Sequence, residues 1–269
     1  AYTVSIAAPT LTLTPAAGTL TAAYAAPFTQ VFTAAGGSGS FSYAITGTLP
    51  AGLSFSGNTL SGTPTVPGSY PITVTATDTV LTGAGAPFTA SNNYTIDVPA
   101  PTITVAPATL PNTTAGLAYS QTLAATGGAS PYTFAVTAGS LPTGTSLTAA
   151  GALSGTTTAS GTFNFTVTAT DAFGQTGTQA YTVVVAVPTL TLTPATLPAA
   201  TAGTAYTQVL TVSGGIAPYT TTLTGTLPAG VTFNAATRTF SGTPTQAGTF
   251  NLSVTVTDST GGTAATVTN

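Results

Sequence analysis

Only one arginine and four aspartates of this 269-residue sequence carry a charge, and three of the aspartates occupy one repeated position. Asp78, Asp171 and Asp258 each follow a run in which apolar residues alternate with threonine, while Asp97 and Arg238 complete the set. Acid–base catalysis with this inventory would need two aspartates in one cleft. The repeat separates them by a whole module, so we expect them to accept backbone N–H bonds in turns. We therefore expect no enzyme.

The residue types that are absent exclude further kinds of site. The sequence has no Lys, Glu, His, Cys, Met or Trp. Disulfides and the usual thiolate or imidazole metal sites are therefore ruled out, and no cofactor is expected. A single arginine cannot neutralise a row of phosphates, so we expect no nucleic-acid partner.

The surface chemistry predicts an extracellular or cell-surface location. Charged residues make up 2% of the sequence, the formal charge is −3 and the mean hydropathy is +0.43. Such a chain has little charge repulsion to keep its molecules apart, so we expect a surface covered by sugars or an assembled state. No apolar run of about 18 residues is present, and we expect no membrane insertion. The sequence does not begin with Met, which predicts a mature product or an excerpt.

One stretch recurs three times and organises the whole sequence. It reads LPAGLSFSGNTLSGTPTVPGSYPITVTATD over residues 49–78 and returns, with changes, over residues 141–171 and 227–258. Leu-Pro-x-Gly and Ser-Gly-Thr-Pro predict turns, and the closing segment alternates apolar residues with threonine as a half-buried strand does. With about seven such strands per module and no helical periodicity, the sequence predicts an all-β chain of three tandem Ig-like antiparallel β-sandwiches.

The module boundaries follow from the proline-led strands that open each copy. We expect an N-terminal strand over residues 1–8, module one over 9–100, module two over 101–187, and module three over 188–269 without its last strand.

These motifs carry a resemblance to a known family. The string LPxGL, SGTP, Gly-Ser/Thr-Tyr/Phe and V-T-A/V-T-D resembles the He-PIG-type immunoglobulin-like repeats, which are related to cadherin-like domains and occur in bacterial surface proteins. Thr157 replaces the motif proline in the middle copy, and residues 78–92 carry an insertion. The resemblance raises a calcium site at Asp78, Asp171 and Asp258. One carboxylate per repeated position is too few for calcium's several oxygen ligands, so turn capping remains the favoured interpretation.

The two ends of the sequence complement each other. Tyr2, Val4 and Ile6 stand before Pro9 as Tyr181, Val183 and Val185 stand before Pro188. We expect them to be a donor strand that completes module three of another copy, in a linear homopolymer of the chain. The acceptor groove would then include the inward residues of the last long strand, which are Phe250, Leu252, Val254 and Val256. The same pattern fits one period of a longer covalent array, or a sequence that begins and ends at arbitrary points.

The leading functional hypothesis is therefore a structural subunit or repeat segment of an extracellular filament or surface stalk. An adhesive array, in which loops such as residues 78–92 bind surface glycans, is the alternative, and a surface-layer protein is the third. Four Asn-x-Ser/Thr sequons predict surface glycosylation, at Asn93, Asn112, Asn164 and Asn251. O-linked sugar on threonine is an equal alternative.

Overall fold

The computed structural model describes all residues from 1 to 269, and every regular element in it is a β-strand. The chain separates into two compact units. Unit 1 comprises residues 1–103, 126–132 and 170–176, and unit 2 comprises residues 104–125, 133–169 and 177–269. No helix is long and apolar enough to cross a bilayer.

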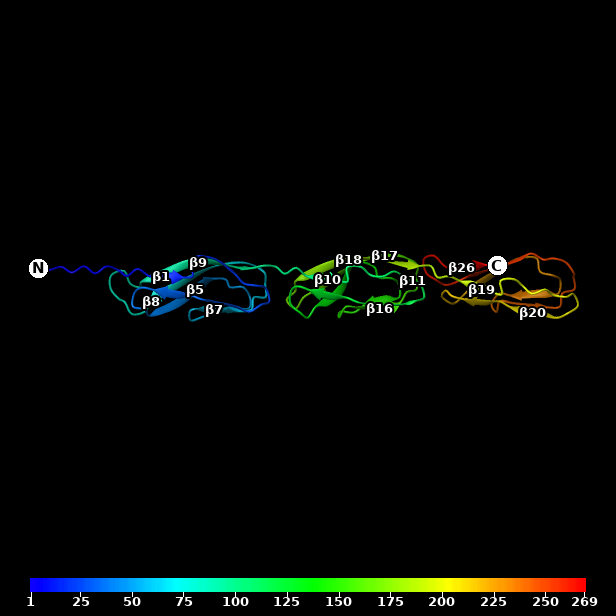
Figure 1. The fold of residues 1–269 in the computed structure, drawn as a ribbon, viewed down its shortest axis with the longest axis horizontal. Coiled ribbons are helices and arrows are strands. Elements are labelled where there is room, and N and C mark those ends of the chain that lie inside the picture. Colours follow the sequence, from blue (N-terminus) through cyan, green and yellow to red (C-terminus); the bar gives the residue numbers. More distant parts are fainter. The chain divides into compact units, whose positions relative to one another are not determined.

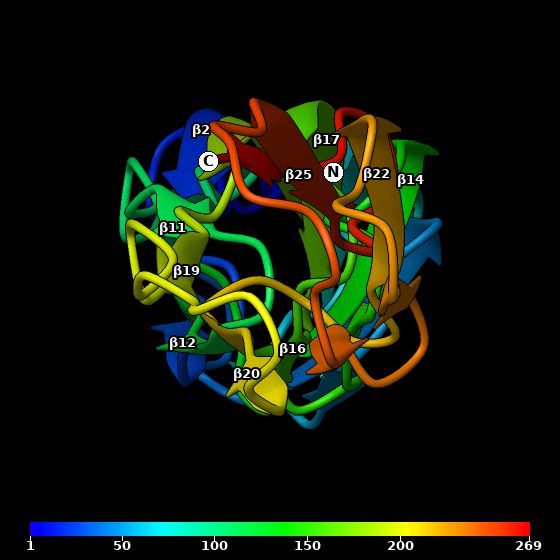
Figure 2. The ribbon, with the colours of Figure 1, turned by 90° about the vertical axis from the view of Figure 1, so that its right-hand side faces the viewer.

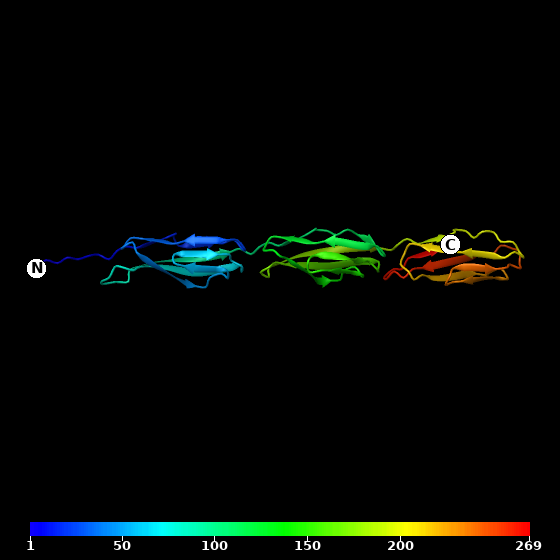
Figure 3. The same ribbon diagram turned by 90° about the horizontal axis from the view of Figure 1, so that it is seen from below.

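The first sandwich lies in unit 1, and its strands can be followed from blue to cyan in Figure 1. Its strands are β1 (Thr12–Thr14), β2 (Gly18–Thr21), β3 (Phe28–Val31), β4 (Thr33–Ala35), β5 (Phe41–Gly47), β6 (Leu53–Ser56), β7 (Thr59–Gly62), β8 (Gly68–Asp78) and β9 (Thr89–Val98). They form a four-stranded sheet in the order β2-β9-β8-β5, a three-stranded sheet in the order β3-β7-β6, and the pair β1-β4. Figure 3 shows the layers of this sandwich edge-on.

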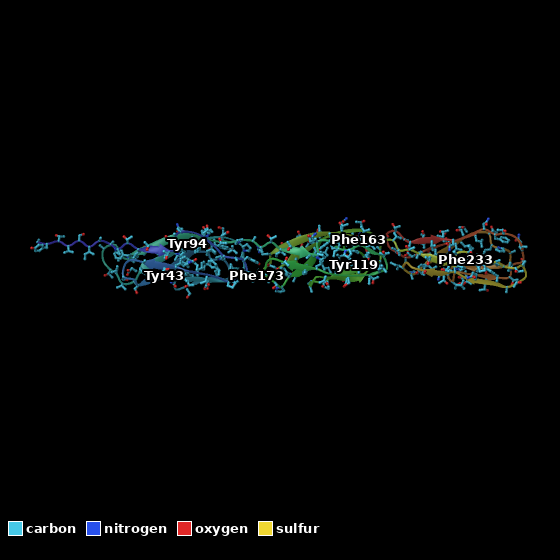
Figure 4. All side chains as sticks on the ribbon, in the orientation of Figure 1. Tyr43, Tyr94, Tyr119, Phe163, Phe173 and Phe233 are labelled. Atoms are coloured by element: carbon cyan, nitrogen blue, oxygen red, sulfur yellow. The ribbon has the colours of Figure 1, made fainter.

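The long hairpin of β8 and β9 supplies much of the core of this sandwich. Successive side chains of a strand point to opposite faces, so Ile72, Val74 and Ala76 are buried while the threonines between them face outward. Opposite Ile72 stands Tyr94, which packs edge-on against Phe32 at a centroid distance of 5.1 Å. Figure 4 labels Tyr94 among the side chains of this sandwich. The alternation read from the sequence is confirmed.

The two turn motifs of the repeated stretch meet in space. Gly52 of Leu-Pro-x-Gly has φ +91°, and a Cβ on it would lie 1.9 Å from the carbonyl oxygen of Thr63. Gly62 of Ser-Gly-Thr-Pro has φ +139°, and its Cβ would lie 2.1 Å from the carbonyl oxygen of Gly52. Any other residue at either position would collide with the main chain. The motif therefore marks a close crossing of two backbone segments rather than two separate turns.

Most of the second sandwich lies in unit 2. Its strands are β10 (Thr104–Ala106), β11 (Thr113–Thr114), β12 (Ala118–Thr122), β13 (Ala124–Thr126), β14 (Thr133–Gly139), β15 (Thr145–Leu147), β16 (Ala152–Thr156), β17 (Gly161–Thr170) and β18 (Thr176–Ala186). They repeat the first pattern, with sheets β11-β18-β17-β14 and β12-β16-β15 and the pair β10-β13. In both sandwiches the last strand also pairs in parallel with an early one, β9 with β2 and β18 with β11, which the sequence did not indicate.

Thr157, which replaces the motif proline, is fully buried and hydrogen-bonded. Its hydroxyl donates to the carbonyl oxygen of Thr114 at 3.0 Å, and its N–H donates to that of Leu117 at 3.2 Å. A proline could make neither bond. The departure from the motif is therefore compensated within unit 2.

The third sandwich, also in unit 2, is less complete. Its strands are β19 (Thr191–Thr193), β20 (Tyr206–Val209), β21 (Thr211–Ser213), β22 (Thr220–Gly225), β23 (Val231–Asn234), β24 (Thr239–Gly242), β25 (Leu252–Thr257) and β26 (Thr266–Thr268). The sheets are β22-β25-β26 and β20-β24-β23, with the pair β19-β21. Figure 2 shows β20 on the opposite side of this sandwich from β25.

The expectation that module three has no last strand needs a correction. β26 pairs with β25 over three residues, with Val267 opposite Val256. β26 is equivalent to the first three residues of β9 and of β18, and it shows the same alternation of inward and outward side chains. The rest of the strand, and the parallel partner that β2 and β11 represent in the other sandwiches, have no counterpart.

Candidate strand-acceptor groove

The repeated aspartates cap loops at the ends of the long strands. Asp78 is buried and accepts hydrogen bonds from the N–H groups of Ser38, Val80 and Leu81 and from the Ser38 hydroxyl, at 2.6–2.9 Å. The bond from the Ser38 N–H and the other donors together hold the pKa of Asp78 well below its usual range. The inward orientation and the capping role expected from the sequence are confirmed here.

Asp171 and Asp258 are bound in the same way. Asp171 accepts from the N–H groups of Ala129, Phe173 and Gln175 and from the Tyr24 hydroxyl, which is 2.7 Å away. Asp258 accepts from the N–H groups of Ile216, Thr260 and Ala265 and from the Thr260 hydroxyl. Burial raises the pKa of both carboxyls, but these donors outweigh it and the net pKa is lowered.

These carboxylates have little capacity left for other chemistry. Each accepts four hydrogen bonds, and nowhere in residues 1–269 do three His, Cys, Asp or Glu side chains gather at one point. A carboxylate held by several N–H donors organises a loop. The arrangement is that of three structural caps.

The distinctive site of the molecule is the incomplete edge of the third sandwich. β8 and β17 have 11 and 10 residues, whereas β25 has six and begins only at Leu252. In the first sandwich β9 covers the equivalent part of β8, with Tyr94 opposite Ile72 and Ile96 opposite Tyr70. On β25 the pairing with β26 ends at Thr255, and the last bonds of the chain on this edge join Val254 and Asn269. Leu252 is accordingly only half-buried, whereas Ile72 and Phe165 at the same position are buried.

Two adjoining hollows open where the missing part of the strand would lie. They measure about 310 and 470 Å³ and share Leu197, Phe240, Phe250 and Leu252 as lining residues. Val254 lines the smaller hollow, but Val256 is fully buried opposite Val267. Three of the four residues predicted for an acceptor groove therefore line it, and Val256 does not.

These two hollows together form the candidate groove, which is called the acceptor groove below after the role predicted for it. The sequence did not predict its opposite wall. It includes Leu192, Pro194 and Leu197, and Asn269 closes one end. An alignment of the three modules could have indicated this wall, because Pro15 and Pro107 are at the position equivalent to Pro194. Both carbonyl oxygens accept a bond from a last-strand tyrosine, Tyr94 or Tyr181, at 2.6 and 2.7 Å.

Comparison with known proteins identifies the modules. Residues 4–99, 100–186 and 188–269 each match the He_PIG family, described as "Putative Ig domain". The chain belongs to this family. The matches confirm the resemblance carried by the sequence motifs and, with the strands described above, the all-β Ig-like fold. Tandem He_PIG and other Ig-like repeats are typical of extracellular structural or adhesive arrays, and the fold is typically non-enzymatic.

Several solved structures are similar over the whole length of the He_PIG chain. The I-band fragment I67–I69 from titin is 12% identical with a TM-score of 0.41, and the match covers 98% of each chain. Mouse cadherin-23 EC22-24 is 16% identical with a TM-score of 0.35, over 97% of this chain and 98% of that one. Protocadherin gammaB7 EC3-6 is 15% identical with a TM-score of 0.36, over 97% and 74%. No curated protein matches the sequence.

The N-terminal segment of the He_PIG chain is free of the sandwich that follows it. Residues 1–8 contain no strand, and Figure 1 shows them leading away from the strands of unit 1. Tyr2, Val4 and Ile6 are 105%, 83% and 89% exposed. No other large apolar side chain in the chain is as exposed as these three. The structure thus places the predicted donor residues in solvent, outside all three sandwich cores.

The four sequon asparagines are exposed. Asn93 and Asn164 accept bonds from the hydroxyls of Thr73 and Thr182, and Asn112 accepts one from the N–H of Val184. These bonds use the side-chain oxygen Oδ1, whereas a sugar is attached to Nδ2. Asn251 lies beside the acceptor groove. The bonds of Asn93, Asn112 and Asn164 therefore do not use the nitrogen to which a sugar would be attached.

The single cationic side chain belongs to the body of the third He_PIG repeat. Arg238 lies in the turn between β23 and β24 with φ +52°, and its guanidinium carbon is 5.9 Å from the ring centroid of Tyr219. Its Nε is buried, and the N–H of Leu210 donates to its carbonyl oxygen at 2.8 Å. Arg238 is thus built into the fold rather than presented to a ligand.

Proposed function

We propose that the chain is a structural subunit or repeat segment of an extracellular filament or surface stalk, joined end to end by β-strand complementation. The observation that carries the proposal is the acceptor groove of the third repeat, where the first and second repeats have a full last strand. An open sheet edge of this kind binds an added strand through main-chain hydrogen bonds and side-chain pockets. The partner is a second copy of the same chain.

The N-terminal segment has the residues that the groove lacks. Tyr2, Val4 and Ile6 have the spacing of Tyr94, Ile96 and Val98, which are buried at the equivalent edge of the first repeat. Moving each of the three from water into the groove stabilises the complex by about 1.5–3 kcal/mol before the entropy of ordering the segment is subtracted. The same exposed side chains are a liability in a free molecule. Strand complementation would fill the groove and bury these exposed side chains in a single contact.

A covalent version of the same architecture fills the groove differently. In a longer chain, residues that follow Asn269 would supply the strand, and residues 1–8 would complete a preceding repeat. The two versions share the groove and differ in whether separate chains assemble.

The test is assembly of the 269-residue chain with and without residues 1–8. We expect the full chain to form filaments of uniform width in negative-stain micrographs and the truncated chain to remain monomeric in sedimentation, because only the former carries the strand. A full-length variant in which Ser5 becomes alanine is the matched control, since this side chain alternates with the inward ones.

Undiminished filaments from the truncated chain would refute strand donation. Monomers from both chains would favour the covalent version, in which the 269 residues cannot join by themselves.

A further inference from the structure

We infer that the donor strand seats in a single register, set by Tyr2, whose hydroxyl binds the carbonyl oxygen of Pro194 in the acceptor groove. The inference rests on the proposed strand complementation and assigns to it the residue that determines alignment. The groove itself, the hydrogen bonds at its closed end and the equivalent tyrosines of the first two repeats carry it.

The closed end of the groove fixes the starting point. The N–H of Val254 donates to the carbonyl oxygen of Asn269 at 2.8 Å, and the N–H of Asn269 donates back at 3.1 Å. The Asn269 side chain also donates to the carbonyl oxygen of Leu192 at 3.0 Å, as Asn92 does to that of Leu13 at 2.9 Å. Asn269 therefore occupies the place of Asn92, which stands opposite Val74 on β8.

The register of the first repeat then assigns the following positions. Two residues after Asn92 comes Tyr94, opposite Ile72, and the equivalent of Ile72 is Leu252. A donor strand with Tyr2 in the place of Tyr94 puts Tyr2 opposite Leu252. Val4 then faces Phe250, as Ile96 faces Tyr70.

Apolar alternation alone does not choose this register. A slip of one residue would turn Thr3 and Ser5 inward and is excluded by the apolar groove. A slip of two residues keeps apolar side chains inside, so a further contact must exclude it. Tyr2 is the only inward side chain of the donor that has a hydroxyl. In the first two repeats the hydroxyl of the equivalent tyrosine, Tyr94 or Tyr181, donates to the carbonyl oxygen of a proline. Pro194 lines the smaller hollow at this position.

The C-terminal end of the donor strand also has a segment with which it can pair in parallel. In the second repeat Thr114 pairs in parallel with Ala186, and the N–H of Ala115 donates to the Ala186 carbonyl oxygen at 3.0 Å. The equivalents in the third repeat are Thr201 and Ala202, and Ala202 is exposed whereas Ala115 is buried. The inferred register brings Ala7 of the donor to this segment.

Engineered cysteines test the register directly, because the chain has none of its own. Since Val254 and Asn269 exchange both of their hydrogen bonds, the pair three residues further on, Asn251 and Thr3, is a non-hydrogen-bonded pair with a short Cα separation of about 4.5 Å. The equivalent pair of the second repeat, Asn164 and Thr182, is in direct contact at 2.7 Å. A disulfide fits such a spacing.

The experiment compares Thr3→Cys/Asn251→Cys with Ser5→Cys/Asn251→Cys, in full-length chains oxidised after assembly. We expect the first variant to give a ladder of covalent multimers on a denaturing gel. The second, which has the same chemistry two residues out of register, is expected to give little or none. Cross-linking of the Ser5 variant in place of the Thr3 variant would overturn the register while leaving strand complementation intact.

Tyr2→Phe provides a second measurement that does not need cysteines. Loss of one hydroxyl bond at an unchanged apolar surface is expected to raise the critical concentration for assembly roughly 2- to 10-fold, whereas Ser5→Ala should leave it unchanged. An unaltered critical concentration for Tyr2→Phe would overturn the role of the hydroxyl. If the wild-type chain forms no filaments at all, strand complementation between separate chains fails and not the register alone.

Discussion

Single residues in this chain act mainly by satisfying the backbone of loops. Asp258 receives three backbone N–H groups and one hydroxyl from two different loops of the third repeat. Its replacement leaves those donors buried without acceptors, and each such loss costs about 1–3 kcal/mol when it is not compensated. A residue that sequence alone presents as a candidate ligand is thus a determinant of stability.

We expect Asp258→Ala to lower the free energy of unfolding at pH 7 by about 2–3 kcal/mol, with a smaller loss for Asp258→Asn, which keeps one acceptor oxygen. Urea unfolding followed by circular dichroism measures it. Asp97→Asn is the control, since no side-chain bond of Asp97 supports a loop, and its change should stay within about 0.5 kcal/mol.

The stability lost in Asp258→Ala should become smaller as the pH falls. The folded pKa of Asp258 lies below the unfolded value of about 3.9. The folded state therefore binds fewer protons, and this stabilisation is full above about pH 5 and disappears as the pH falls through the folded pKa. The gap between wild type and Asp258→Ala should narrow in acid, and a gap that widened would contradict the assigned hydrogen bonds.

At the scale of elements, the length of a strand in this molecule follows from its partner. β8, β17 and β25 have nearly the same alternating sequence, yet β25 is shorter by four residues or more. Residues 248–251 read GTFN, as do residues 161–164 at the start of β17, but they have no neighbour to bond with on the open edge. The difference lies in pairing and not in intrinsic preference.

We expect residues 248–251 and 200–202 to gain hydrogen-exchange protection on assembly, because the added strand supplies partners for their amides. Mass spectrometry of filaments and of the chain lacking residues 1–8 measures the difference. Residues 255–257 serve as the internal control, since β26 already pairs with them in the single chain. Equal exchange rates at 248–251 in both samples would show that no strand is added there.

The same elements show how far the sequence determines the structure. Alternation in residues 72–76 predicted which face of β8 is buried, since a period of two residues is a local property. The parallel pairing of β2 with β9 and the crossing of Gly52 with Gly62 were missed, because both depend on segments that meet only after folding. The acceptor groove was half predicted: Phe250, Leu252 and Val254 follow from parity, whereas Pro194 and Leu197 come from a distant edge. Val256 was assigned wrongly because β26 covers it.

At the scale of the whole molecule, the composition leaves the surface with very little charge. A formal charge of −3 over 269 residues and a mean hydropathy of +0.43 give little repulsion between copies. The four sequon asparagines are exposed, and their bonds leave Nδ2 for a sugar. Sugars and assembly both remove bare surface from water.

We expect enzymatic removal of N-linked sugars to lower the mass of the native material, because sugars occupy one or more of the sequons. Intact-mass spectrometry before and after the treatment checks this. An unchanged mass would exclude N-linked sugars at the four asparagines.

Arg238 determines where trypsin can cleave the chain. Trypsin cleaves after Lys or Arg, and this chain offers it one peptide bond, between Arg238 and Thr239. Thr239 opens β24, the central strand of its sheet, where it is paired with Val209 on one side and Asn234 on the other. A protease binds its substrate as an extended, unpaired segment, and on the C-terminal side of this bond β24 is paired along both edges. Cleavage there therefore requires β24 to leave its sheet, so the resistance of the chain to trypsin should follow the stability of the third repeat.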